Sequence, residues 1–333
     1  MTDYCHLHVN MLPNLPTTSS LSQCIWFDNE ILICGGKNNN NCYSYHLLKQ
    51  EYKLICAYPK ETKLNSHIVV SCAPKNSAKD SITLLSFGGS VSLKIKHHTL
   101  IMNYKSVWKD DTAPAELHKN QWIPLPDHNV FGEQEMHEFN GARVCVGGKN
   151  MHLLFISRCP NKIDVIDMET FRYLHDVKNN TLPIPQDIQT LQHCFVGVAP
   201  NRFLLICEDT NVMITFHEKD NEFVYEFLPG CLLLRRCWGY AFAYLNNQIY
   251  FFGGYDYKKK KRMRFIHIYD VGLGKFFQVN QQMPFPISRS AAVPLVGSRP
   301  CSIHVFGGAN DENKDLNTHF LFTQVVYFFS SFF

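Results

Sequence analysis

The sequence lacks several features that would assign the chain to a compartment or to a chemistry. Its first residues contain no basic segment followed by an apolar run, as a secretory signal would. Its longest apolar stretch, Val325 to Phe333, is about half of the ~18 residues that a membrane-spanning helix needs. No metalloprotease, nucleophile-elbow or phosphate-loop motif occurs. We therefore expect a cytoplasmic protein with no membrane partner and no cofactor.

A charge excess and a cysteine framework are also missing. The 333 residues include 32 basic and 29 acidic side chains, and this balance argues against a nucleic-acid or membrane partner. The 13 cysteines form no C-x-x-C pair, and Cys34 and Cys207 lie within apolar runs. We interpret them as small core residues in a reducing compartment. His6/His8 and His97/His98 are close histidine pairs, but spacing places no third ligand beside them, so no metal site is expected.

What the sequence does contain is an internal repeat. A run of apolar residues followed by two glycines occurs four times, and these structural repeat glycines are Gly35, Gly36, Gly88, Gly89, Gly253, Gly254, Gly307 and Gly308. The interval from Gly88 to Gly253 is close to three times each of the other intervals. Two degenerate copies are therefore expected between them, and alignment puts their anchors near Ser157-Arg158 and Glu208-Asp209.

The same alignment treats Gly147 and Gly148 as part of a hairpin turn and not as a repeat anchor. We therefore expect a valine at Gly147 to be far less damaging than a valine at Gly253, where strand ends crowd together.

A second regularity supports this alignment. Aromatic or apolar residues seven positions apart follow the anchors, as in Tyr45/Tyr52, Ile166/Tyr173, Phe216/Phe223 and Tyr269/Phe276. Each repeat also contains about four short runs rich in β-branched and aromatic residues, separated by turn residues. Six units of four antiparallel strands predict an all-β propeller.

An apolar run, a double glycine and two spaced aromatic residues together resemble the kelch repeat, although Tyr or Phe stands where kelch blades usually place Trp. The resemblance covers essentially the whole chain and implies a single six-bladed kelch-type β-propeller over residues 1–333. Residues 6–13 resemble the fourth strand of blade five, and we predict that residues 5–12 pair as the closing strand of the last blade. The blades are expected at residues 17–64, 65–126, 127–182, 183–230, 231–286 and 287–333.

The resemblance also implies that the loops between second and third strands share one binding face with the connections between blades. The candidate partner-binding residues on this face are Arg236, Ser288, Arg289, Lys258, Lys259, Lys260, Lys261, Arg262 and Arg264. The cations from Lys258 to Arg264 either form a solvated loop tip or anchor an acidic or phosphorylated protein segment. Arg236 and Arg289, at similar distances before their glycine pairs, either clamp a carboxylate at the channel mouth or act as structural hydrogen-bond donors.

The function expected from these features is that of a non-catalytic interaction module or scaffold. The alternative is a copper oxidase resembling galactose oxidase, which would need Tyr and His ligands at the channel mouth. Residues 127–140 would add an acidic sector to the binding face, and the insertion at 105–121 would lie on the opposite face. The aromatic tail, 325–333, either packs under the last blade or precedes a further domain.

Overall fold

The computed structural model describes residues 6–72, 81–89, 98–109, 120–125, 139–184, 193–230, 232–297 and 300–325. Strands, turns and loops make up this part of the chain, and none of it is helical. It therefore contains no helix that is long and apolar enough to cross a membrane. The segments outside the described residues include the loop at 90–97, residues 110–119 of the insertion, residues 127–138 of the expected acidic sector and the tail after residue 325.

The strands of the first half form three antiparallel sheets of four strands each. Sheet 1 consists of β2 (Gln23–Phe27), β3 (Glu30–Gly36), β4 (Asn39–His46) and β5 (Glu51–Ala57). Sheet 2 consists of β6 (His67–Cys72), β7 (Ser81–Gly88), β8 (His98–Lys105) and β9 (Ile123–Pro124). Sheet 3 consists of β10 (Arg143–Gly147), β11 (Leu153–Arg158), β12 (Lys162–Asp167) and β13 (Arg172–Tyr173).

The second half repeats this arrangement and adds one small sheet. Sheet 4 consists of β14 (Cys194–Ala199), β15 (Arg202–Cys207), β16 (Thr210–His217) and β17 (Glu222–Leu228). Sheet 5 consists of β19 (Ala241–Leu245), β20 (Gln248–Phe252), β23 (Phe265–Asp270) and β24 (Lys275–Gln282). Sheet 6 consists of β25 (Ala291–Leu295), β26 (Ser302–Phe306), β27 (His319–Val325) and β1 (His6–Met11). The added three-stranded sheet consists of β18 (Cys237–Trp238), β21 (Tyr255–Asp256) and β22 (Lys261–Arg262).

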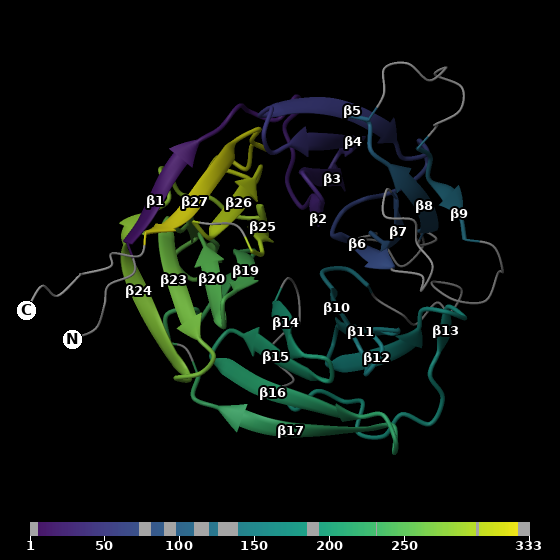
Figure 1. Ribbon diagram of the computed structural model, residues 1–333. Coiled ribbons are helices and arrows are strands. Elements are labelled where there is room, and N and C mark those ends of the chain that lie inside the picture. The colour runs from purple at the N-terminus through teal and green to yellow at the C-terminus, as the bar shows by residue number, and fades with distance from the viewer. Residues whose placement is uncertain are drawn as a thin grey trace, which may run out of the picture.

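The two ends of the described chain meet in sheet 6. Strand β1 pairs antiparallel with β27 over its whole length, from His6 opposite Val325 to Met11 opposite Phe320. This is the pairing that the sequence predicts for the N-terminal strand. Figure 1 shows the result, in which the purple N-terminal strand lies beside the yellow C-terminal one and the six sheets follow one another around a common centre.

The core of the described chain lies between successive sheets. Each of six clusters of buried apolar side chains joins two neighbours, and the cluster of Ile31, Ile33, Val293 and Phe306 joins sheet 6 to sheet 1. Both faces of each second strand are therefore buried, as in β3, where every residue is buried. Such strands need continuous apolar sequence and not alternation, which explains the apolar runs before the glycine pairs.

The glycine pairs lie at the end of the second strand of four sheets, where backbone of the next connection passes close by. Gly253 has a φ of +62°, and a Cβ there would overlap the carbonyl oxygen of Ile287. Gly147 ends β10, in the hairpin register expected from the sequence, but a Cβ there would overlap the carbonyl oxygen of Pro200. Because sheet 4 packs against this hairpin, a Cβ at Gly147 meets backbone almost as closely as one at Gly253, which argues against a large difference between the two valine substitutions.

The aromatic pairs seven residues apart are direct cross-strand partners of the third and fourth strands. Tyr45 lies opposite Tyr52 with ring centroids 4.8 Å apart, and Phe216 lies opposite Phe223 at the same separation. Tyr269 and Phe276 pair at 4.5 Å. In these tight hairpins, residues seven positions apart lie side by side on neighbouring strands. The spacing therefore marks the hairpin formed by the third and fourth strands of a sheet.

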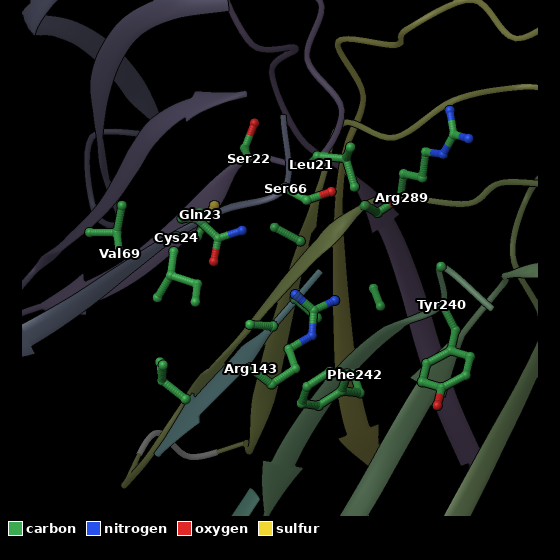
Figure 2. Close-up of a pocket in the computed structure, with 18 of the residues that line it drawn as sticks. Leu21, Ser22, Gln23, Cys24, Ser66, Val69, Arg143, Tyr240, Phe242 and Arg289 are labelled. Atoms are coloured by element: carbon green, nitrogen blue, oxygen red, sulfur yellow. The ribbon is translucent and has the colours of Figure 1, made fainter. Parts of the chain in front are cut away.

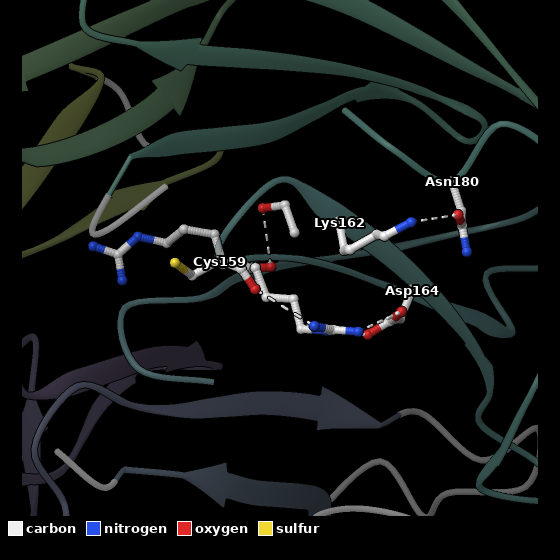
Figure 3. A network of polar contacts seen from close by, with 7 residues as sticks. Cys159, Lys162, Asp164 and Asn180 are labelled. Atoms are coloured by element: carbon white, nitrogen blue, oxygen red, sulfur yellow. Dashed lines mark hydrogen bonds and ion pairs between the residues drawn. The ribbon is translucent and has the colours of Figure 1, made fainter. Parts of the chain in front are cut away.

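Sheet 3 lacks the glycine pair and has polar side chains instead. Ser157 and Arg158 end β11, and the Arg158 guanidinium pairs with Asp164 at 2.5 Å while both side chains are 11% exposed. Lys162 donates to Asn180 at 3.3 Å in the same network (Figure 3). Buried polar groups need partners, and this network supplies them at an end of the sheet where the four repeats with a glycine pair have bare backbone.

Candidate functional site

The lysine-rich loop is the tip of a short, well-anchored hairpin. Strands β21 and β22 pair through Tyr255–Arg262 and Asp256–Lys261, and β18 pairs with β21. The Asp256 carboxylate accepts hydrogen bonds from the backbone amides of Lys258 at 3.0 Å and Lys259 at 2.9 Å. The four lysines from 258 to 261 are exposed, so they form a compact array of charge on an ordered turn.

Two residues predicted to bind a partner are instead buried. The Arg262 guanidinium donates from Nε to Ser288 Oγ at 2.9 Å and from Nη2 to Asn313 Oδ1 at 2.7 Å. Arg262 is 6% exposed and Ser288 is 1% exposed. Burial, more than the neighbouring charge of Arg289, lowers the pKa of Arg262. The bonds of Arg262 connect the hairpin to the loop after β26. The donors of Arg262 and the hydroxyl of Ser288 are thus already engaged within the protein.

Arg264 lies just beyond the hairpin, in front of β23. It is exposed, and its Nε donates to the carbonyl oxygen of Met283 at 3.1 Å. This bond ties it to the neighbouring chain segment, so it lies apart from the lysine array.

Arg289 lies beside an aromatic pair on the same side of the molecule. Trp238 and Tyr255 meet edge to face at 5.6 Å, and the Arg289 guanidinium lies 5.1 Å from the Trp238 ring centroid. The Nε of Arg289 is buried and has no hydrogen-bond partner among the residues that the structure describes. A buried donor without an acceptor destabilises the fold, and an acceptor that binds to it would remove that penalty. We call the exposed and half-buried cations of this region the cationic face, which comprises Arg235, Arg236, Lys258, Lys259, Lys260, Lys261 and Arg289.

The expected equivalence of Arg236 and Arg289 is wrong. Ala241 of β19 and Ala291 of β25 each pair with the last residue of the second strand of their own sheet, so they occupy equivalent positions. The residues two positions before them, Gly239 and Arg289, are therefore equivalent as well. Both have a left-handed backbone, with φ of +66° and +62°. Arg289 lines the central cavity, whereas Arg236 lines a separate cavity of about 330 Å³ that also includes Leu232 and His267. The two arginines therefore do not form the predicted clamp.

The central cavity measures about 220 Å³ and is lined by residues from the first strand of each of the six sheets or from just before it (Figure 2). One charged side chain extends into it that the sequence analysis did not single out. Arg143 begins β10, and its guanidinium lies 5.6 Å from the Phe242 ring centroid. The position of Arg143 in the cavity follows from its place at the start of the first strand of sheet 3. A repeat alignment that placed the start of β10 at Arg143 would have predicted this position.

In the described part of the chain, no three His, Cys, Asp or Glu side chains gather closely enough to hold a metal ion. His67 illustrates where the histidines lie: it is fully buried, and its two ring nitrogens are 2.8 Å and 3.1 Å from the carbonyl oxygens of Leu64 and Cys34. The one ring therefore connects two backbone segments.

Comparison with known proteins concerns the fold. No family model matches the chain, and no curated protein matches its sequence. The solved structure described as "Structure of YjhT" superimposes with a TM-score of 0.66 at 13% identity, covering 92% of this chain and 95% of that one. The chain therefore has an all-β, propeller-like fold. In all, 540 chains of solved structures match it, and a fold this widespread does not identify a function.

Proposed function

We propose that the chain is a single six-bladed propeller of the kelch type, in which each four-stranded sheet is one blade. The recurring glycine pairs, the cross-strand aromatic pairs and the six inter-sheet cores support this interpretation. The pairing of β1 with β27 gives such a ring a closed joint between its first and last strands.

We further propose that this propeller is a non-catalytic interaction module that binds an acidic segment of a protein partner on the cationic face. The observation that carries the proposal is the ordered array of exposed lysines on the same face as Arg289, whose buried Nε has no hydrogen-bond partner in the described chain. A guanidinium stacked on Trp238 is held in place, and a fixed donor loses little freedom when it binds a carboxylate or a phosphate.

Apolar groups around the second cavity suit the same kind of partner. Leu232 is 76% exposed and Leu233 is 41% exposed, and both line the cavity that Arg235, Arg236 and Lys259 share. His267 lines this cavity and is 4% exposed, and its buried Nδ1 has no hydrogen-bond partner in the described part of the chain. An acidic segment that also presents an apolar side chain would cover both kinds of surface.

Selection of random peptides on the intact chain tests this proposal. We expect enrichment of Asp and Glu next to an apolar residue. Changing Lys258, Lys259, Lys260 and Lys261 together to Ser should abolish the enrichment, because close cations attract an acidic segment jointly. A control variant removes the same charge elsewhere by changing the exposed residues Lys60, Lys149, Lys219 and Lys275 to Ser. Equal loss in both variants, or no acidic enrichment on the unaltered chain, would refute the proposal.

A further inference from the structure

The central cavity contains a positive charge whose terminal nitrogens have no hydrogen-bond partner among the described residues. The Nε of Arg143 donates to the carbonyl oxygen of His193 at 3.1 Å, and the guanidinium carbon lies 5.6 Å from the Phe242 ring centroid. Within the described chain the Nη nitrogens make no hydrogen bond. Figure 2 shows the guanidinium extending into the space between Phe242 and the side of the cavity formed by Gln23 and Ser66.

No carboxylate balances this charge among the described residues that line the cavity. Burial lowers the pKa of Arg143, and the smaller opposing influences come from Tyr240 and Cys194 and not from an acid. Arginine keeps its proton even so. Arg143 is half-buried, so its charge is only partly removed from water. A partly desolvated cation without a counter-charge gains from binding an anion.

The other polar side chains of the cavity narrow the choice of anion. Ser290 donates to the carbonyl oxygen of Gly307 at 3.0 Å, and Ser22 is bonded to Ser19. The Gln23 amide, by contrast, has no hydrogen-bond partner within the described chain and lies on the cavity wall. One guanidinium and one amide suit a single negative charge spread over two oxygens.

Size and apolar surface define the rest of the ligand. Phe242, Val69 and Ala292 line the same cavity, whose volume of about 220 Å³ admits a small molecule. Arg289 also lines it, but Figure 2 shows its guanidinium pointing away from that of Arg143. A second full charge therefore does not face the same point.

We propose that the central cavity binds a small organic monocarboxylate, with its carboxylate on the Nη groups of Arg143 and the Gln23 amide and its apolar part against Phe242. This site shares no residue with the lysine array, and the inference does not rest on the proposed protein partner.

Benzoate and its neutral counterpart benzamide test the site by isothermal titration calorimetry on the whole chain. We expect benzoate to bind and benzamide not to bind, because only benzoate supplies the negative charge. Arg143→Gln should weaken benzoate at least roughly tenfold, as expected for loss of a charged hydrogen-bond pair. Gln23→Leu should weaken it by less. The control is Arg172→Gln, an exposed arginine on β13 of the same sheet, which should leave the affinity unchanged.

Three results would overturn the inference: equal binding of benzoate and benzamide, unchanged benzoate affinity in Arg143→Gln, or loss of binding when the four lysines are changed to Ser. If Arg143→Gln does not fold, nuclear Overhauser effects in the unaltered protein decide the question. Contacts between the benzoate ring and the Phe242 ring support the site, and their absence at saturating benzoate refutes it.

Discussion

Polar side chains serve opposite purposes at the joint between sheets 6 and 1 and on the cationic face. At the joint, the Tyr52 hydroxyl lies 2.8 Å from His319 Nδ1, and His319 Nε2 lies 2.8 Å from His304 Nδ1. On the cationic face, the four lysines are exposed to solvent, and the buried Nε of Arg289 has no hydrogen-bond partner among the described residues. Groups that satisfy one another stabilise a fold, whereas exposed charges such as these lysines remain available to a ligand.

The largest effect on stability should come from deleting residues 1–12. The deletion removes all six residue pairs between β1 and β27, takes Leu7 out of the core between sheets 5 and 6, and leaves β27 as an open edge. We expect a fall in the melting temperature of at least about 5 °C or a loss of soluble protein, since about 1 kcal/mol already moves the midpoint by a few degrees in a large domain.

Deletion of residues 1–5 alone is the control for this experiment, because it leaves every β1–β27 pair in place. If both truncated chains melt together with the full chain, β1 contributes nothing to the closure of the sheets.

Acid should weaken the joint next most strongly. Burial lowers the pKa of His304 to about 4, and burial together with the charge of His304 lowers the pKa of His319 to about 2. Both rings are therefore neutral in the folded chain and take up protons near pH 6.5 when it unfolds. Stability is complete above about pH 6.5 and falls with decreasing pH, by about 1.4 kcal/mol per pH unit for each such histidine.

Urea unfolding between pH 7 and pH 4.5 measures this slope. The double variant His304→Gln, His319→Gln keeps hydrogen-bonding side chains that do not titrate. Its unfolding free energy should therefore fall less steeply with decreasing pH, by the uptake of up to two protons fewer on unfolding. An identical slope in both proteins would show that the joint is not the acid-sensitive part.

A smaller loss is expected when Arg262 is removed from below the cationic face. Arg262→Met breaks the buried bonds to Ser288 and Asn313 and should lower the free energy of unfolding by about 2–4 kcal/mol. Arg264→Met, at an exposed arginine with one bond to Met283, should cost no more than about 1 kcal/mol. Urea denaturation of both variants compares them directly, and equal losses would contradict the division between structural and exposed cations.

The repeat was predictable from the sequence because its signals recur at regular intervals. Two aromatic residues across a hairpin depend only on nearby chain positions, and the glycine pairs stand out by their spacing even though each meets a distant part of the chain. The site was less predictable because burial depends on what packs on top. Arg262 looks like its lysine neighbours in sequence, yet Asp311, Asn313 and Ser288 enclose it. Arg143 escaped notice because its place in the cavity depends on the exact start of β10.

We expect the lysine array to serve binding and not stability. The variant with Lys258, Lys259, Lys260 and Lys261 changed to Ser tests it in one titration of an acidic peptide selected on the intact chain, performed at low and high salt alongside urea unfolding. We predict an unfolding free energy within about 0.5 kcal/mol of the unaltered chain, with an affinity loss of roughly tenfold or more at low salt that shrinks at high salt. Unchanged affinity at both salt concentrations, or a loss of stability that matches the loss of binding, would contradict the claim.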